Sequence, residues 1–254
     1  MGWLNGATAT GVFAFSCLLG LFFIYRSRKL DANLLLYLGL TYFFAGLIYF
    51  GDFLDFITIL LTGTNVDNST GFIGIINWMW FPGVILFAMY LGAELMIPNK
   101  KKLILIIYFI LGIVFELFLF LETEASITYT NPVIPGEDLI NDNMVEDSVM
   151  FYLTLFFLLS VIAFLGFGFL IRAIQTKGDI RKNFLYLSIG AFVYTIGGIL
   201  DGLFSPGIIL IVIRSAMISS SAMFYLGLWI GVIFMGFSSM ASRILLSSFS
   251  MFSR

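Results

Sequence analysis

Residues 97–121 read IPNKKKLILIIYFILGIVFELFLFL: three lysines come before nineteen residues, of which Glu116 alone is charged. A helix of about 20 predominantly apolar residues is long enough to cross the hydrocarbon core of a membrane. Short basic loops stay on the cytoplasmic side, so the lysines predict a helix that begins inside the cell and runs outward. This stretch therefore predicts a transmembrane helix, its direction and one charge within it.

The same alternation runs through the whole chain. Hydrophobic residues make up 60% of it and charged residues 11%, which is typical of a membrane protein. Twelve of the 13 Lys and Arg residues follow the first, third, fifth or seventh apolar segment, and Arg214 lies inside the seventh. The pattern predicts an all-α bundle of seven transmembrane helices, with the amino terminus outside and the carboxyl terminus in the cytoplasm. The predicted spans are residues 6–26, 33–56, 72–96, 102–121, 149–172, 183–204 and 206–238.

These spans predict one transmembrane domain over residues 1–240 and a short cytoplasmic or interfacial tail at 241–254. They leave no room for a soluble catalytic domain, so we expect an integral protein of the cytoplasmic membrane that is not an enzyme. The absence of histidine disfavours zinc and haem sites with His ligands, and catalysis by a histidine base. Cys17 is the only cysteine, which excludes disulfides and thiolate metal sites. We therefore predict no metal and no cofactor.

Ionisable side chains inside the spans form the candidate site. On insertion scales each costs at least ~2.5 kcal/mol near the bilayer centre, which makes it a functional hypothesis by default. The group lies in the outer halves of the spans and comprises Asp52, Asp55, Glu116, Asp201 and Arg214. We expect a polar cavity open to the outside, with Arg214 paired to Asp201 or Asp52. Its surplus negative charge favours a cation, an amine or a proton.

The alternative is that these acids lie at the outer headgroup level and only mark the ends of helices. We prefer this alternative for Asp55. For Glu116 and Arg214, which have apolar sequence on both sides, we prefer a functional role or a fixed pair between helices. Glu94 lies close to the inner lysines and predicts an interfacial salt bridge with them.

Trp78 comes shortly before Pro82 in the third span. Tryptophan at this depth is typical of the aromatic belt at a membrane surface. Pro82 removes a backbone hydrogen bond and should kink the helix, so Trp78 could instead form a wall of the cavity above the kink. The longest outer loop, residues 122–148, holds seven carboxylates, and both a lid over a ligand and a plain solvated loop fit it.

An internal duplication is a further hypothesis. Shifting the chain by 149 residues places Leu36-Tyr37-Leu38 over Leu185-Tyr186-Leu187 and Asp52 over Asp201. Two triplets of helices in the same orientation, joined by one helix, would form the three-plus-one-plus-three parallel repeat of some small transporters. Chance matches between sequences rich in Leu, Ile and Phe are the alternative.

Seven spans with an outward amino terminus resemble microbial rhodopsins in topology alone. A covalently bound retinal needs a lysine in the last span, where the only basic residue of this chain is Arg214, so we expect no retinal. Two intramembrane aspartates also resemble those of aspartyl membrane proteases. The segments Phe50-Gly51-Asp52 and Leu200-Asp201-Gly202 do not match the Tyr-Asp and Gly-x-Gly-Asp motifs of that family.

These patterns favour a non-enzymatic sensor or receptor-like membrane protein. Its outward acidic cavity would take a small ligand, a cation by preference, between Asp52, Glu116, Asp201, Arg214 and Trp78. The inner loops are short, so we expect a membrane or cytoplasmic partner protein to carry the signal. The alternatives are a small transporter or cation-conducting protein, built from the two repeats, and an assembly subunit whose buried charges pair with another membrane protein. No motif for nucleic-acid binding is present.

Overall fold

The computed structural model describes residues 2–204 and 207–228 of the chain. The predicted tail at 241–254 and the end of the seventh predicted span lie outside these residues. Within them, six helical segments are long and apolar enough to cross a membrane, and a bent pair of helices adds a seventh if it counts as one span. The expectation of an all-α integral membrane protein is confirmed at this level, whereas the direction of insertion stays a prediction.

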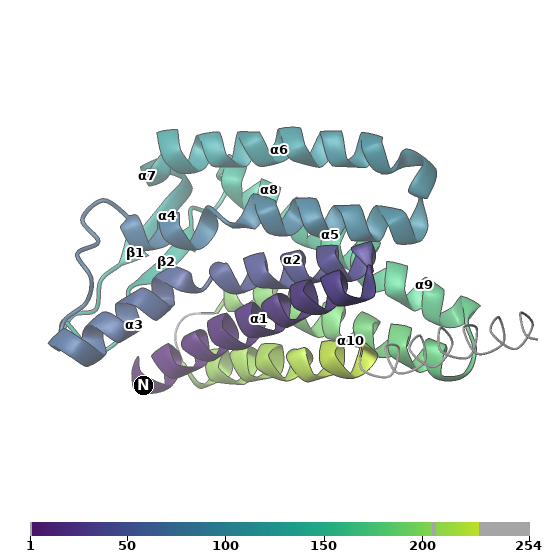
Figure 1. Ribbon diagram of the computed structural model, residues 1–254. Coiled ribbons are helices and arrows are strands. Elements are labelled where there is room, and N and C mark those ends of the chain that lie inside the picture. The colour runs from purple at the N-terminus through teal and green to yellow at the C-terminus, as the bar shows by residue number, and fades with distance from the viewer. Residues whose placement is uncertain (1, 205–206, 229–254) are drawn as a thin grey trace, which may run out of the picture.

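The helices lie side by side along one direction, with α6 at one edge of the bundle (Figure 1). We call the end that holds residues 63–71 and 122–148 the outer end, following the sequence prediction. The described spans are α1 (Gly2–Leu30), the bent pair α2 (Asn33–Leu47) and α3 (Phe50–Thr62), α4 (Phe72–Trp78) with α5 (Phe81–Met96), the turn η1 (Pro98–Lys100) with α6 (Lys101–Leu121), α8 (Val149–Val161) with the π-helical turn η2 (Ile162–Gly166) and α9 (Phe167–Gln175), α10 (Gly178–Asp201), and a last helix, Ile208–Leu228.

The second span is bent by 45° between α2 and α3. Before the bend, α2 lies so close to α1 that a Cβ atom on Gly46 would be 2.9 Å from the backbone nitrogen of Cys17. After it, a Cβ atom on Gly51 would be 2.6 Å from Oδ1 of Asn77, so only glycine fits where α3 meets α4. Small residues permit this close approach between helices in a membrane. The bend and the two contacts bring Asp52, in the first turn of α3, into the interior of the outer end.

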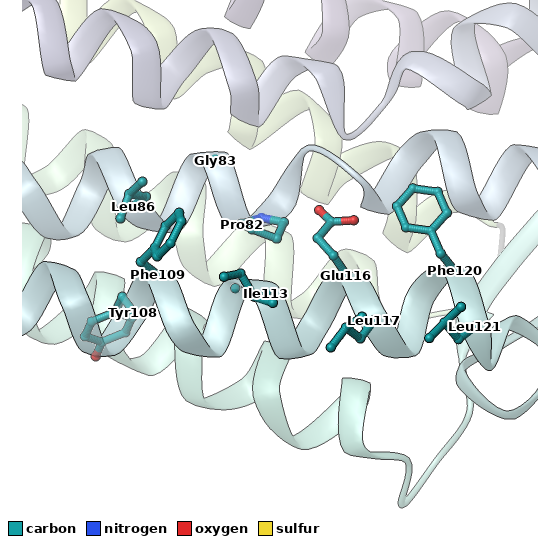
Figure 2. A pocket seen from close by; sticks show the side chains of 11 residues that line it. Pro82, Gly83, Leu86, Tyr108, Phe109, Ile113, Glu116, Leu117, Phe120 and Leu121 are labelled. Atoms are coloured by element: carbon teal, nitrogen blue, oxygen red, sulfur yellow. The ribbon is translucent and has the colours of Figure 1, made fainter.

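The third span is interrupted one turn before its proline. Helix α4 ends at Trp78, and α5 begins at Phe81 with Pro82 as its second residue. A proline lacks the N–H group that would continue the helix, and its ring crowds the preceding turn, so a new helix starts here. The irregularity expected from Pro82 is therefore present, and it lies beside α6 (Figure 2).

The 122–148 segment is folded. It forms a short helix, α7 (Thr123–Ser126), and an antiparallel hairpin of β1 (Ile127–Thr130) and β2 (Asn141–Met144), with Ile127 opposite Met144. The Ile127 side chain is 2% exposed and belongs to the main apolar core. The hairpin is thus anchored to the bundle, which a plain solvated loop would not be.

At the inner end, Nζ of Lys101 lies 2.7 Å from Oε2 of Glu94, which is the salt bridge expected from the sequence. The two spans that the duplication would relate differ in shape, because α10 is one continuous helix of 24 residues whereas the second span is bent. The duplication stays a prediction.

Candidate functional site

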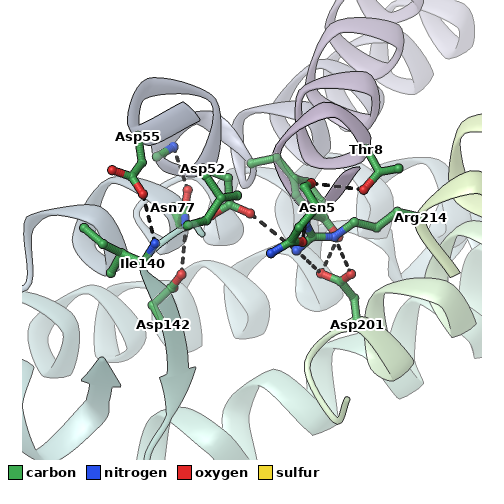
Figure 3. A network of polar contacts seen from close by, with 12 residues as sticks. Asn5, Thr8, Asp52, Asp55, Asn77, Ile140, Asp142, Asp201 and Arg214 are labelled. Atoms are coloured by element: carbon green, nitrogen blue, oxygen red, sulfur yellow. Dashed lines mark hydrogen bonds and ion pairs between the residues drawn. The ribbon is translucent and has the colours of Figure 1, made fainter. Parts of the chain in front are cut away.

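Arg214 is the centre of a buried polar cluster at the outer end (Figure 3). Its Nε donates to Oδ1 of Asp201 at 2.8 Å, and its Nη1 donates to Oδ1 of Asn5 at 2.7 Å. Its Nη2 lies 3.4 Å from Oδ2 of Asp52. The side chains of Arg214, Asp52 and Asp201 are 8%, 10% and 13% exposed. The sequence predicted that Arg214 would pair with one of these two aspartates, and it contacts both.

Asn77 extends the cluster from α4. It accepts the Gly51 N–H at 2.7 Å through Oδ1, and its Nδ2 lies 3.0 Å from Oδ1 of Asp52 and 3.2 Å from Oδ1 of Asp142. Nε1 of Trp78 donates to the other oxygen of Asp142 at 3.0 Å. One amide group thus joins two carboxylates, and within the described residues Trp78 is hydrogen-bonded to the cluster through Asp142. We call Asn5, Asp52, Asn77, Asp142, Asp201 and Arg214 the outer network.

Asp142 comes from strand β2, outside the spans. Its burial raises the pKa of the carboxyl group, while the hydrogen bonds from Trp78 and Asn77 oppose that rise. Sequence reasoning missed it, because it was one of seven acids in a segment interpreted as a loop. No local pattern distinguishes Asp142 from the other six.

Asp55 ties the outer segments to α3 instead of contributing to the outer network. It is 0% exposed, so its carboxylate does not reach water, and its depth in the membrane stays a prediction. Its oxygens accept hydrogen bonds at 2.9 Å from the backbone N–H groups of Val66 and Ile140 and from Nδ2 of Asn65. Three donors to a buried carboxylate satisfy the charge without a cation.

Asn5 of the outer network and Tyr49 beside it also escaped the sequence analysis. Helix α1 begins at Gly2, earlier than the predicted start at residue 6, which places Asn5 within the helix. The Nδ2 of Asn5 also donates to Oδ1 of Asp138 at 3.1 Å. The Tyr49 hydroxyl, at the bend between α2 and α3, donates to Oδ2 of Asp201 at 3.0 Å. Asparagine and tyrosine near a span end carry no signal that would separate these two roles from ordinary surface positions.

Glu116 is separate from this network, which corrects the single cavity expected from the sequence. It points from α6 toward the level of Pro82 (Figure 2), and no hydrogen bond or ion pair joins it to any described residue. Its side chain is partly buried, and its Oε2 atom is buried with no hydrogen-bond partner in the described part of the chain. Burial of a lone carboxylate away from water is strongly unfavourable unless it gains a proton or a cation. Among the described residues, nothing neutralises the charge of Glu116.

The space around Glu116 is a groove between α5 and α6 with a volume of about 400 Å³, which we call the Glu116 groove. Apart from Glu116 and Tyr108, whose hydroxyl donates to Oγ of Ser160 at 2.6 Å, its lining side chains are apolar. Phe109, Ile113 and Phe120 are 56%, 46% and 52% exposed, so the groove opens sideways, where lipid would surround the bundle. The lining residues include Pro82, Gly83 and Leu86 of α5 and Phe109, Ile113 and Phe120 of α6.

A scan against protein-family models and a search of curated proteins return no match for this chain. Among residues 2–204 and 207–228, no group of three or more acidic or cysteine side chains is arranged to hold a metal ion. What the site can do must therefore follow from its side chains: the outer network pairs its members internally, whereas the Glu116 groove combines space with an unpaired acid.

Proposed function

We propose that this chain is a non-enzymatic, receptor-like membrane protein that binds a small cationic ligand in the Glu116 groove and acts through a partner protein. The observation that carries the proposal is the unpaired Oε2 of Glu116 beside about 400 Å³ of mostly apolar space. Small-molecule sites are typically apolar pockets of about 300–1,000 Å³ with a few polar groups that fix the ligand. A cation would neutralise the carboxylate, which supports the choice of ligand charge.

The outer network supports the proposal as the scaffold around this site. It holds α1, α3, α4 and α10 together through Asn5, Asp52, Asn77 and Asp201, all linked to Arg214 or to one another. Pro82 and Gly83 of the groove follow the interruption between α4 and α5, and α4 carries Asn77 and Trp78 of the outer end. A ligand against Pro82 would change how α5 sits relative to a fixed α4. Movement of α5 would reach the inner end, where a partner could detect it.

The assembly subunit is a second candidate, and the position of Glu116 favours it. The groove opens at the side of the bundle, and α6 is the least buried of the spans within the described residues. An assembly partner would place a lysine or arginine of its own helix against Glu116. The transporter alternative calls for matching helix breaks in both halves, and the bend of the second span has no counterpart in α10, which is continuous.

The test uses the purified chain in nanodiscs of zwitterionic lipid, with thermal unfolding as the readout. The probes are n-butylamine and n-decylamine, and butanol and decanol serve as uncharged controls. Wild type should be stabilised by at least one amine, by about 2.7 kcal/mol at a hundred times Kd, and by neither alcohol. Glu116→Gln should abolish the effect.

Glu122→Gln is the matched control, because it makes the same chemical change at an exposed position just beyond α6. It should respond to amines as the wild type does. Equal responses of Glu116→Gln and wild type, or no response to either amine, would remove the support for a ligand at this site. A helix from a partner could then be sought by measuring whether Glu116→Gln dissociates a complex formed in native membranes.

A further inference from the structure

The Glu116 groove extends along α6, and its length restricts what can occupy it. Its lining residues on α6 run from Tyr108 to Leu121. At about 1.5 Å of rise per residue, this length is roughly 20 Å. Glu116 divides the groove unequally, with about 12 Å on the side of Tyr108 and about 8 Å on the side of Leu121. The acid therefore lies nearer the outer end, and a longer apolar stretch lies deeper.

We propose that the groove binds a single-chain amphiphilic amine, with its ammonium group at Glu116 and its alkyl tail along α6 toward Tyr108. This inference rests on the proposed function and names the ligand class. The ligand would be an amine dissolved in the membrane, not a water-soluble amine.

Charge complementarity determines the head group. The lone carboxylate has no donor or cation among the described residues, and a protonated amine supplies both. An alcohol could offer one hydrogen bond but would leave the charge unneutralised. An anionic amphiphile would be repelled. Primary amines also fit because three N–H donors can reach both carboxylate oxygens from one atom.

The groove dimensions determine the tail. Bonds of an extended chain advance about 1.2 Å each, as in an extended polypeptide, so roughly ten bonds cover the 12 Å between Glu116 and Tyr108. Gly112 and Ile113 lie on this side, where glycine leaves room beside Pro82. A volume of about 400 Å³ lies near the lower end of small-molecule pockets and suits one chain better than the two chains of a membrane phospholipid.

The opening of the groove determines the route. Phe109, Ile113 and Leu117 are about half exposed at the side of the bundle, so a ligand would enter from the bilayer. A single-chain amphiphile in the outer leaflet already points its head outward and its tail inward, as Glu116 and Tyr108 require. A transmembrane helix from a partner is 10–12 Å wide with its side chains, so it would cover the groove without filling it.

The experiment is photo-crosslinking of the full chain in nanodiscs with a decylamine probe that carries a diazirine at the tail end. Mass spectrometry of the cross-linked peptides should place the label near Tyr108 and Phe109, at the deep end of the groove. Glu116→Gln should reduce labelling there roughly thirtyfold, the loss expected when one partner of a buried charge pair is removed. Glu122→Gln should label as the wild type does. The decanol probe with the same diazirine should give only the level seen with Glu116→Gln.

Each outcome decides between the two proposals. If butylamine stabilises the wild type through Glu116 while the decylamine probe does not label the groove, the amphiphile is wrong and the cationic ligand stands. If the label falls near Leu121, the orientation of the tail is wrong. If decanol and decylamine probes label equally, the groove accepts any alkyl chain and the amphiphilic amine is wrong, whereas the cationic ligand stands or falls with the response to butylamine.

Discussion

The outer network and the Glu116 groove both place carboxylates among apolar helices, but only the network supplies partners for them. Asp52 and Asp201 meet the guanidinium of Arg214, and Asp52 also accepts from Asn77. Glu116, on α6, has no partner among the described residues. An acid in a span is therefore not by itself a ligand site. What distinguishes a candidate is a charge that the fold leaves unsatisfied next to open space.

The two regions also differ in what the removal of a charged group should do to stability. In the network, each charge is held by groups from other helices, so its removal leaves a partner unpaired. In the groove, removal of the acid leaves nothing unpaired within the described chain. Substitutions in the two regions should therefore change stability in opposite directions.

Arg214→Met should give the largest loss. It leaves Asp52 and Asp201 without their cation, and breaking a buried ion pair by removing one partner costs about 3–5 kcal/mol. The measurement is unfolding of the reconstituted protein by denaturant or heat. Arg172→Met is the control, because Arg172 lies near the inner end, where it donates to the Leu95 carbonyl, and forms no ion pair in the described structure. Wild-type stability for Arg214→Met would show that the network is not held by this charge.

Asn77→Leu should give the next largest loss. The change removes the amide that donates to Asp52 and Asp142 and accepts the N–H of Gly51. Hydrogen bonds to charged groups contribute about 1.5–3 kcal/mol, so we expect a loss of about 2–3 kcal/mol. Asn77→Asp would retain the acceptor for Gly51 but place a third acid beside the two aspartates. It should therefore be less stable than Asn77→Leu, and the reverse order would contradict the bridging role of the amide.

The sequence predicts the spans well because hydropathy and charge are local properties. Residues 102–121 already contain the length, the apolar run and the inner lysines that define α6. The contact between Asp201 and Arg214 could also be anticipated, since only 13 residues separate them across a short connection. These features need no knowledge of how distant helices are arranged.

The remaining parts of the site depend on that arrangement. Asn5 meets Arg214 across 209 residues, and Asn77 meets Asp142 across 65, so no local pattern reveals either contact. Glu116 was grouped with Asp52 because both acids were expected at similar depth. The depth of Glu116 in the membrane can be estimated by counting residues along the helix. Which neighbours it faces depends on how α6 is rotated about its own axis. A helix that is apolar on all sides gives little information about rotation.

Glu116→Leu should change stability in the opposite direction from the substitutions in the outer network. It removes a partly buried acid whose Oε2 has no partner among the described residues and adds apolar surface in an apolar groove, so the protein should gain about 1 kcal/mol. Thermal unfolding in nanodiscs without added amine is the measurement. The control Glu122→Leu changes an exposed acid and should leave stability within about 0.5 kcal/mol of wild type. A loss of more than 1 kcal/mol for Glu116→Leu would indicate a structural partner for Glu116.

The smallest effect should be a change in pH dependence at Asp142. Burial raises the pKa of this carboxyl above its ordinary value of 3.8, so between that value and the raised pKa the folded state holds more protons than the unfolded state. Its contribution to stability is therefore present at low pH and is lost as the pH rises through this window. The side chain of Asp142→Asn stays neutral at every pH. The unfolding free energy of the variant should therefore rise relative to that of the wild type as the pH is raised from 4. Glu146→Gln, at an exposed position nearby, should keep the wild-type profile. If stability varies with pH in the same way for Asp142→Asn and wild type, the hydrogen bonds from Trp78 and Asn77 offset the burial of the carboxylate. Asp142 would then be ionised in the folded protein, and protonation would not contribute to its stability.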